Sequence, residues 1–441
     1  MTSLRKIPEI AALRSGQGVI RIPPETDVPL TPRVRRLIDT SAFRRLSRVS
    51  QLGLVRHVYP AANHSRQEHS LGVYRTALLF VDRLADDEQF AALVAPAAAE
   101  RFLVAALLHD IGHWPYCHPI EDIGLPQLPT HEEFAVESLS TPEVSALLAA
   151  DWDLEPPAIV ELLDGQPTDP ADRLLQSMLS GPIDVDKMDY LMRDSLHAGV
   201  PYGRNFDQQR LIQSLCVSES GDALAISEKG KTAAEMMVFA RYVMFSEVYW
   251  HHAVRSATAM LQRAFFLVHE RLSIPDEFRQ DDAGMERALL DAAGESPAGE
   301  LLAGLFGAQR RLYKRVAQWS VLEDRDAYER LARRPFAWLV DLSVRFAEAA
   351  SSLIGEPVSP HEVLFDAPPM ALEVEFDLDV RFAKEGRYRR LGQVSPVVHT
   401  LARQQFDDYV KRVRMFAAPR IAGQLRDRQL WRTALAAALT K

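Results

Sequence analysis

The sequence predicts a mainly α-helical protein with a smaller α/β lobe at its C-terminal end. Apolar residues recur at helical spacing through residues 71–84, 102–113 and 233–272, which is typical of amphipathic helices that pack into a core. Residues 371–382 alternate apolar and charged side chains instead, which is the pattern of a half-buried strand. We therefore expect a helical core followed by a mixed lobe.

Length and composition indicate a globular protein of more than one part. At 441 residues the chain exceeds the usual size of a single hydrophobic core. Its 47% hydrophobic and 25% charged residues are ordinary for a soluble protein. We predict an N-terminal extended arm over residues 1–30, a helical core over residues 31–355 with the functional site within residues 50–200, and a C-terminal α/β lobe over residues 356–441.

Charge, hydropathy and cysteine content argue against several classes of protein. No apolar run approaches the roughly 20 residues that span a bilayer, and no apolar stretch follows the charges near the N-terminus. We therefore expect a cytoplasmic protein without a membrane partner, whose two cysteines, Cys117 and Cys216, are reduced. The net charge of −9 argues against a general nucleic-acid coat but leaves a local basic pocket, and a nucleic-acid partner, open.

The first half of the chain should consist of helices after a short extended start. A strand or extended arm is expected over residues 18–32, and Thr31-Pro32 opens a helix. Residues 33–49 predict a pair of amphipathic helices whose arginines form a solvated face or, alternatively, the basic rim of an anion site. A further helix carries His69 in its first turns, and the helix of residues 102–113 is stopped by Pro115.

The second half mixes helices with two strand signals. Thr130 resembles a helix start, and Asp186, Asp189 and Arg193 share one face of a later helix. The remaining expectations are a β-hairpin over residues 211–227, a core helix or helix pair over residues 233–272, helices to about residue 354, a strand within residues 371–382, and helical periods in residues 401–416 and 421–439.

A His-Asp pair stands where an apolar helix predicts only burial. His109 and Asp110 directly follow the run of residues 102–108, and buried polar groups need partners. A divalent first-row metal is a suitable partner for an imidazole with a carboxylate, but it needs more than two ligands. His69 and Asp186 are the further candidates. For any one of these histidines taken alone, a hydrogen-bonded core histidine is the alternative interpretation.

A second group of histidines follows the pair along the chain. It comprises His113, His118 and His131, with Glu121 three residues after His118. Attack of metal-activated water on phosphorus needs a proton donor for the leaving oxygen, a group that orients this donor, and contacts for the phosphate charge. Histidine with a carboxylate can supply the first two. Arg66 and Lys187 can supply the charge, although a surface ion pair is the alternative for either one alone.

The order and spacing of these motifs resemble the HD-domain metal-dependent phosphohydrolases. The resemblance is to the branch of the deoxynucleoside triphosphate triphosphohydrolases, which contains a eukaryotic enzyme with a sterile-alpha-motif domain and bacterial relatives. It covers roughly residues 30–210. The motifs that carry it are Gln51-Leu52-Gly53, Val58-Tyr59-Pro60, His64-Ser65-Arg66-Gln67-Glu68-His69, His109-Asp110-Ile111-Gly112-His113 and Asp184-Val185-Asp186-Lys187-Met188-Asp189-Tyr190.

The resemblance implies an all-helical HD-domain core and a role for each matching residue. One divalent transition metal (Mn, Fe, Ni, Co or Zn), or Mg, would be held by His69, His109, Asp110 and Asp186. His113 and His131 would contact phosphate, His118 would transfer a proton and Glu121 would orient it. Phosphate oxygens would be held by Arg66 and Lys187, and the sugar by Gln51, Leu52, Tyr190 and Asp194. The family's reaction releases a deoxynucleoside and inorganic triphosphate after water attacks the α-phosphorus, and a homo-oligomer, dimer or tetramer, is expected.

The chain departs from this branch at three positions. Glu121 stands where the eukaryotic enzyme has the shorter Asp, and Trp114 replaces a glycine. Val248 stands where that enzyme places an arginine that grips phosphate, so Arg255 or Arg204 would have to replace it. A second hypothesis is therefore an HD phosphatase or phosphodiesterase for nucleoside monophosphates, dinucleotides or nucleic-acid ends. A third is a nucleotide-binding sensor, against which the intact ligand and histidine sets argue.

Overall fold

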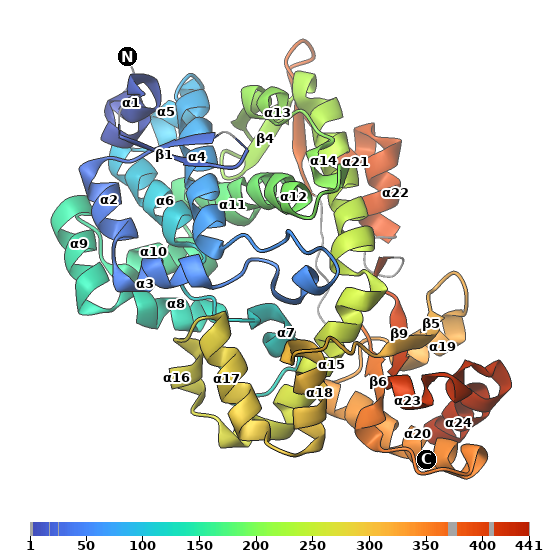
Figure 1. Ribbon diagram of the computed structural model, residues 1–441. Coiled ribbons are helices and arrows are strands. Elements are labelled where there is room, and N and C mark those ends of the chain that lie inside the picture. Colours follow the sequence, from blue (N-terminus) through green and yellow to red (C-terminus); the bar gives the residue numbers. More distant parts are fainter. Residues whose placement is uncertain (1–2, 17, 25, 369–376, 405–409, 441) are drawn as a thin grey trace.

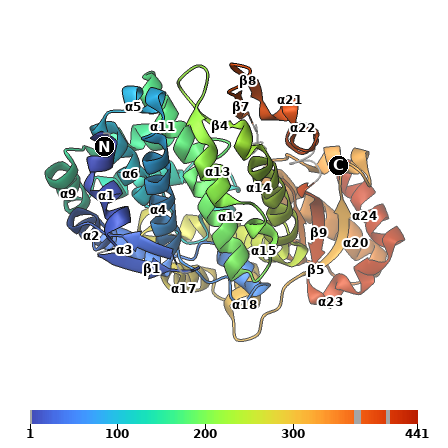
Figure 2. The same cartoon turned by 90° about the horizontal axis from the view of Figure 1, so that it is seen from above.

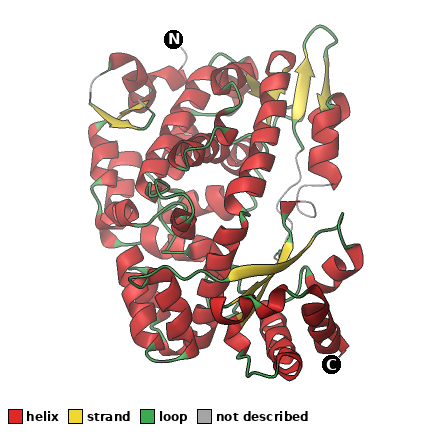
Figure 3. Ribbon diagram, turned by 45° about the vertical axis from the view of Figure 1, so that its right-hand side comes forward, coloured by secondary structure: helices red, strands yellow, loops and turns green. Residues whose placement is uncertain are grey.

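The described part of the chain is mainly helical, with three small sheets (Figures 1 and 3). The computed structural model describes residues 3–440 apart from residues 17, 25, 369–376 and 405–409. Helices fill one end of the molecule, and a sheet-containing lobe that includes the C-terminus fills the other (Figure 1). The predicted fold class is therefore confirmed. In the described part of the chain, no helix has the length and hydropathy needed to cross a membrane.

The N-terminal segment packs as a helix and a hairpin beside the helical core. Helix α1 (Pro8–Ser15) precedes strands β1 (Val19–Ile22) and β2 (Thr26–Pro29), which pair antiparallel, as the strand prediction for this segment requires. The Thr31 hydroxyl then accepts the Val34 N–H and caps α2 (Pro32–Ile38), which is followed by α3 (Ser41–Arg45). The predicted helix pair is confirmed.

Three helices carry the candidate site. They are α4 (Arg66–Leu84), α6 (Pro96–Leu108) and α12 (Val185–His197). Helix α4 packs against both α6 and α12, and α12 also contacts α14 (Lys231–Met244), so that α4, α12 and α14 lie side by side (Figure 2). The last seven residues of α6 are all buried because this part of the helix is apolar on every face. Polar groups at its end therefore lie inside the protein.

The remaining helices complete the two halves of the molecule. A π-helical turn over residues 245–249 joins α14 to α15 (His252–Val268), which confirms the predicted core helix pair. The others are α5 (Glu88–Leu93), α7 (Cys117–Glu121), α8 (His131–Leu139), α9 (Pro142–Trp152), α10 (Pro156–Asp164), α11 (Pro170–Ser180), α13 (Gln208–Ser214), α16 (Ile274–Phe278), α17 (Asp282–Ala293), α18 (Pro297–Phe306), α19 (Arg325–Leu331), α20 (Phe336–Ile354), α21 (Leu391–Val394), α22 (Pro396–Gln404), α23 (Pro419–Ala422) and α24 (Arg428–Thr440).

Two sheets join segments that are distant in sequence. One has the strand order β3-β4-β7-β8 and the other β5-β9-β6. In the first sheet β4 and β7 are parallel, whereas both pairs of the second are antiparallel. The strands are β3 (Leu215–Val217), β4 (Leu224–Ser227), β5 (Lys314–Trp319), β6 (Val363–Asp366), β7 (Asp379–Phe382), β8 (Arg387–Arg390) and β9 (Val413–Ala417).

Two hydrophobic cores meet at the segment that follows α6. Ile111 belongs to the first core, which the helices of the first half build, whereas Trp114 belongs to the second, together with α15, α17, α20 and α24. Trp114 is fully buried and stacks on Phe278, with ring centroids 4.0 Å apart. His113 therefore lies between two packed regions, each of which holds one side of its segment.

The structure corrects four predicted elements. Helix α6 ends at Leu108 rather than near residue 113, because residues 109–112 form turns that begin where the His109 ring bonds the Ala106 carbonyl. Residues 211–214 continue α13, so the hairpin begins only at Leu215. Strand β5 interrupts the helices expected to residue 354, and β9 lies within residues 401–416, predicted to be helical. Both short strands are fixed by pairing with each other, which local periodicity does not report. A strand was also predicted within residues 371–382. Residues 371–376 lie outside the described residues, and β7 (Asp379–Phe382) forms the end of this segment.

Candidate active site

Four side chains predicted to be metal ligands converge from three helices. His69 lies in the first turns of α4, His109 and Asp110 directly follow α6, and Asp186 lies in the first turn of α12. The Nε2 atoms of His69 and His109 are 3.2 Å apart. Asp186 Oδ1 is 2.9 Å from His69 Nε2, and Asp110 Oδ1 is 3.5 Å from His109 Nε2. One ligand atom each of His69, His109 and Asp110 lies within 4.8 Å of the others, and Asp186 adjoins both imidazoles from α12.

Hydrogen bonds on the far side of each ring fix how the two imidazoles face each other. His109 Nδ1 donates to the Ala106 carbonyl at 2.9 Å, and His69 Nδ1 donates to Asp189 Oδ2 at 2.8 Å. A ring that donates through Nδ1 carries its lone pair on Nε2 when it is neutral. Both lone pairs then point inward, which is the tautomer that a metal ligand requires.

The donor set fits a divalent cation. Two imidazole nitrogens that face each other at 3.2 Å, beside the buried carboxylate of Asp110 and the partly exposed carboxylate of Asp186, leave a site that favours positive charge. The same preference is visible in the pKa of His69: burial alone lowers it, but hydrogen bonds to Asp186 and Asp189 raise it to about 10. Two imidazoles with two carboxylates suit Mn, Fe, Co, Ni or Zn, and the carboxylates also suit Mg.

A buried chain of charges extends from His69 into α12. Arg193 donates from Nε and Nη2 to the two oxygens of Asp189, each at 2.8 Å, and from Nη1 to Glu68 at 2.7 Å. His197 lies 2.8 Å from the same Glu68 oxygen. Gly72 in α4 makes room for this pairing, because a Cβ at that position would overlap Asp189 and Arg193. The carboxylate that orients His69 is therefore itself held in place.

The second histidine group gathers around Glu121 of α7. Glu121 Oε1 accepts both the backbone N–H and the Nδ1–H of His131, at 2.8 and 2.9 Å, and Oε2 lies 3.4 Å from His118 Nδ1. The ring centroid of His113 is 5.1 Å from that of His118 and 4.2 Å from that of His131. Burial alone would raise the pKa of Glu121, but the hydrogen bonds from the two histidines lower it, so this carboxylate stays charged.

Arg66 connects the two groups. Its Nη1 donates to Asp110 Oδ2 at 2.9 Å, and Asp110 Oδ1 lies 3.0 Å from His113 Nδ1. Burial and the nearby Arg66 charge both lower the pKa of His113 well below its usual value, so its ring is neutral. Asp110 therefore stands between the candidate metal position and the second histidine group.

A cavity of about 320 Å³ opens onto both groups. Its lining includes these predicted residues: Gln51, Arg66, His69, His109, Asp110, His113, His118, His131, Asp186 and Tyr190. Four other predicted residues do not line it. Glu121 lies behind the histidines, and Leu52 packs against the first core. Lys187 pairs with Asp184 at 2.5 Å, and Asp194 accepts a hydrogen bond from Tyr249 at 2.6 Å. The roles of all these residues remain predictions.

Family models match most of the chain. The HD domain matches residues 66–191, and the HD associated region matches residues 206–428, which is half of the chain. The chain belongs to the HD-domain family. This confirms the predicted resemblance, and the candidate ligands all lie within the matched HD domain.

Relatives of this HD protein include both uncharacterized and named proteins. YwfO of Bacillus subtilis, an uncharacterized protein, is 35% identical over 255 residues, which are 55% of this chain and 52% of that protein. Deoxynucleoside triphosphate triphosphohydrolase SAMHD1 of Homo sapiens is 28% identical over 286 residues, 58% of this chain and 45% of that protein. The chain thus spans about half the length of the curated relatives it matches.

A solved structure covers nearly the whole HD protein. A hypothetical protein from Aquifex aeolicus is 28% identical, with a TM-score of 0.70, over 92% of this chain and 98% of that one. A phosphohydrolase from Bacteroides thetaiotaomicron, 23% identical with a TM-score of 0.66, covers 90% of this chain and 99% of its own, and shows the same fold. The overall fold is therefore shared with these two proteins.

Sequence reasoning did not assign the groups that orient the HD site. Asp189, Arg193 and Glu68 make the hydrogen bonds described above, and Asp184 caps α12 by accepting the Lys187 N–H. The sequence did contain one indication for Asp189, because its spacing from Asp186 places both residues on the same helical face. Glu68 and His197 come from different helices, so only the packing of α4 on α12 brings them together.

Proposed function

We propose that this chain is a metal-dependent phosphohydrolase that acts on (deoxy)nucleoside triphosphates. Water would attack the α-phosphorus and release the (deoxy)nucleoside and inorganic triphosphate. The observation that carries the proposal is the convergence of two imidazole nitrogens and two carboxylates at one wall of a cavity that three further histidines also line. A phosphohydrolase needs this combination of a cation site and proton-transfer groups.

Each group of side chains would have a separate task. His69, His109, Asp110 and Asp186 would hold the cation. When bound, a divalent cation would lower the pKa of water and neutralise charge on phosphate. His118, oriented by Glu121, would give a proton to the leaving oxygen, since it is exposed to the cavity and lies 3.4 Å from that carboxylate. His113 and His131 would contact the phosphate, and Gln51 and Tyr190 would contact the sugar.

The named relatives support the substrate class. The SAMHD1 proteins of Homo sapiens, Bos taurus and Dictyostelium discoideum are named deoxynucleoside triphosphate triphosphohydrolases and are 26–28% identical to this chain. The proposal includes a cytoplasmic location and a homo-oligomer, either a dimer or a tetramer. It also includes the predicted domain boundaries at residues 30 and 355.

The charge of the cavity favours a second candidate, a substrate with fewer phosphates. Of the residues that line the cavity, Arg66 is the single Lys or Arg and already pairs with Asp110, whereas Asp110, Glu132, Asp164 and Asp186 carry negative charge. Arg255 and Arg204, the residues that could replace the phosphate-gripping arginine absent at Val248, do not line this cavity. Val248 is buried. Arg255 bonds Asp366 at 2.5 Å. A monophosphate or a phosphodiester would need less positive charge than a triphosphate.

Metal analysis and product chromatography distinguish these functions. The purified protein should contain, or take up, one divalent metal ion per chain. It is then supplied with deoxynucleoside triphosphates, nucleoside triphosphates, monophosphates and dinucleotides, each with Mn, Mg, Fe, Co or Ni added. Release of inorganic triphosphate supports the first proposal, and turnover of monophosphates or diesters alone overturns it in favour of the second. Binding without turnover of any of these compounds would point to a sensor.

A further inference from the structure

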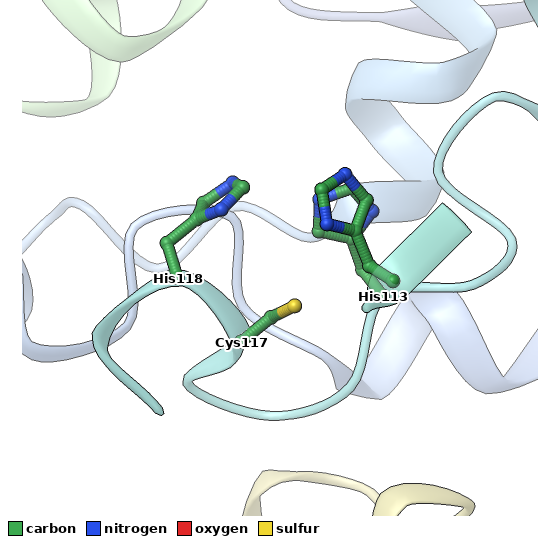
Figure 4. Close-up of side chains that lie close together, drawn as sticks. His113, Cys117 and His118 are labelled. Atoms are coloured by element: carbon green, nitrogen blue, oxygen red, sulfur yellow. The ribbon is translucent and has the colours of Figure 1, made fainter. Parts of the chain in front are cut away.

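One cysteine faces the second histidine group although the proposed reaction gives it no task. Cys117 is the first residue of α7, between the positions of His113 and His118 in the sequence. One ligand atom from each of His113, Cys117, His118 and His131 lies within 4.8 Å of the others. Figure 4 shows His113, Cys117 and His118 converging, with the sulfur directed into the space near the two rings.

We propose that His113, Cys117 and His118 form a second metal site, with His131 as the fourth ligand, which takes a thiophilic cation such as Zn²⁺. A thiolate combined with two or three imidazoles is a donor set that selects zinc-like metals over Mg or Mn. The first set, with two carboxylates and no sulfur, also accepts harder cations such as Mn²⁺ and Mg²⁺. The two sites would therefore discriminate between cations by the softness of their ligands.

The groups behind these ligands resemble those behind the first site. Glu121 accepts the Nδ1–H of His131 at 2.9 Å and faces His118 Nδ1 at 3.4 Å. A carboxylate behind an imidazole orients the other ring nitrogen toward a metal and raises its basicity. The Nε2 atom of His131 also meets Glu132 at 3.1 Å, so we assign His131 the fourth position rather than one of the first three.

Two further observations indicate that this geometry is built into the fold. The His113 side chain is 7% exposed, and Asp110 Oδ1 lies 3.0 Å from its Nδ1 atom, so this ring, like His118 and His131, has a carboxylate beside one of its nitrogens. Tyr116, which turns the chain so that Cys117 faces the histidines, has a left-handed φ of 57°. Such a φ costs a non-glycine residue energy, and here the Tyr116 hydroxyl is anchored by Glu286 at 2.5 Å and Arg56 at 3.0 Å.

Occupation of this site would inhibit the proposed hydrolysis. A cation held by His118 and His113 occupies ring nitrogens that must otherwise carry the proton for transfer and the N–H for phosphate contact. Binding replaces the thiol proton of Cys117, which leaves to solvent, and the sulfur becomes a thiolate ligand. The metal-binding claim stands apart from the proposed function, whereas the inhibition rests on it.

Cobalt absorption tests the metal-binding claim directly. Co²⁺ is added to the full-length protein already loaded with Mn²⁺. We expect a thiolate-to-cobalt charge-transfer band that saturates at one ion per chain, is absent in Cys117→Ser, and persists in the matched control Cys216→Ser, which replaces the other buried cysteine. Absence of the band in the wild type, or its persistence in Cys117→Ser, overturns the proposal.

A second variant keeps the test decisive if Cys117→Ser does not fold. The His118 side chain is 61% exposed, so His118→Ala should preserve the fold, which circular dichroism checks. We expect this variant to need at least tenfold more Co²⁺ for half of the band. An unchanged cobalt affinity overturns the site.

Zinc inhibition then tests the consequence. Each variant's rate is expressed relative to its own rate without zinc, and Cys117→Ser should require at least tenfold more Zn²⁺ for half inhibition than the wild type. Equal sensitivity overturns the inhibitory role. If the protein gives the cobalt band but hydrolyses no phosphate compound when assayed with Mn²⁺ alone, the proposed function fails and the second site stands. Turnover with Mn²⁺ by a protein that gives no band is the reverse result.

Discussion

The two histidine groups differ in how firmly the fold holds them. His69 is 1% exposed and belongs to a long helix packed between two others, and its outer nitrogen is held by the Asp189–Arg193 pair. His118 lies on a five-residue helix and its side chain is 61% exposed. A metal site needs ligands fixed to within a fraction of an ångström, whereas a proton donor must also meet a substrate and water. The difference suggests a division between a rigid metal site and an accessible reaction site.

Charge separates the two groups as well. The first contains two carboxylates that face the candidate metal position, and Arg66 keeps the pKa of Asp110 well below its usual value although burial opposes this. In the second group, the carboxylate of Glu121 lies beside the Nδ1 atoms of both His118 and His131. Variants that lower metal content and variants that lower turnover at unchanged metal content would test whether the two groups have separate tasks.

Asp110→Ala should have the largest effect, because it removes a ligand and also the partner of Arg66. We expect metal affinity to fall by more than about 100-fold and turnover to be lost with it. Metal analysis and activity assays are made on the same preparation. Asp164→Ala, which removes another carboxylate from the lining of the same cavity, is the control. Full metal content and activity in Asp110→Ala would refute the ligand assignment.

His118→Ala should separate chemistry from metal binding. Loss of a general acid lowers turnover by about 10²–10⁴-fold, and the content of the first metal site should not change. His252→Ala, an exposed histidine outside the cavity, provides the control and should keep wild-type turnover. If His118→Ala loses the metal instead, the division between the two groups is wrong.

The comparison also explains which parts of the site the sequence predicts. His109 and Asp110 stand out because they follow seven buried apolar residues, and the spacing of Asp186 and Asp189 places them on one helical face. These signals are local. The Glu68–Arg193 and Tyr116–Glu286 contacts join residues more than a hundred positions apart, so only the packed structure brings them together.

The same distinction holds for the fold. Long amphipathic segments such as α4 and α15 were predicted because helical periodicity over many residues is specific. Strand β9 was missed because five consecutive buried residues, Val413–Ala417, fit a helix and a central strand equally well. Its identity is decided by β5 and β6, which pair with it from both sides.

Asp189→Asn tests the rigidity of the first group with a smaller expected effect. An asparagine can offer an N–H to His69 Nδ1, which would move the ring proton to Nε2 and block the ligand lone pair. Loss of such an outer hydrogen bond lowers metal affinity by about 10–100-fold. Isothermal titration with Mn²⁺ measures it. Asp194→Asn, a buried carboxylate on the same helix that bonds His64 and Tyr249, should leave the Mn²⁺ affinity unchanged. Equal losses in both variants would show a general effect of burial.

Glu121→Gln should produce the smallest change, a shift in pH dependence. Burial alone would lower the pKa of His131, but the hydrogen bond and charge of Glu121 raise it above the usual 6.5, so the imidazolium that would contact phosphate persists to higher pH. Without the carboxylate the pKa falls, and the basic limb of the kcat/KM profile should move to lower pH. Because Glu132 raises the same pKa more weakly, Glu132→Gln should move the limb in the same direction by less. A limb that stays in place or moves to higher pH in Glu121→Gln would mean that another group controls it, and His131 would lose its assigned role.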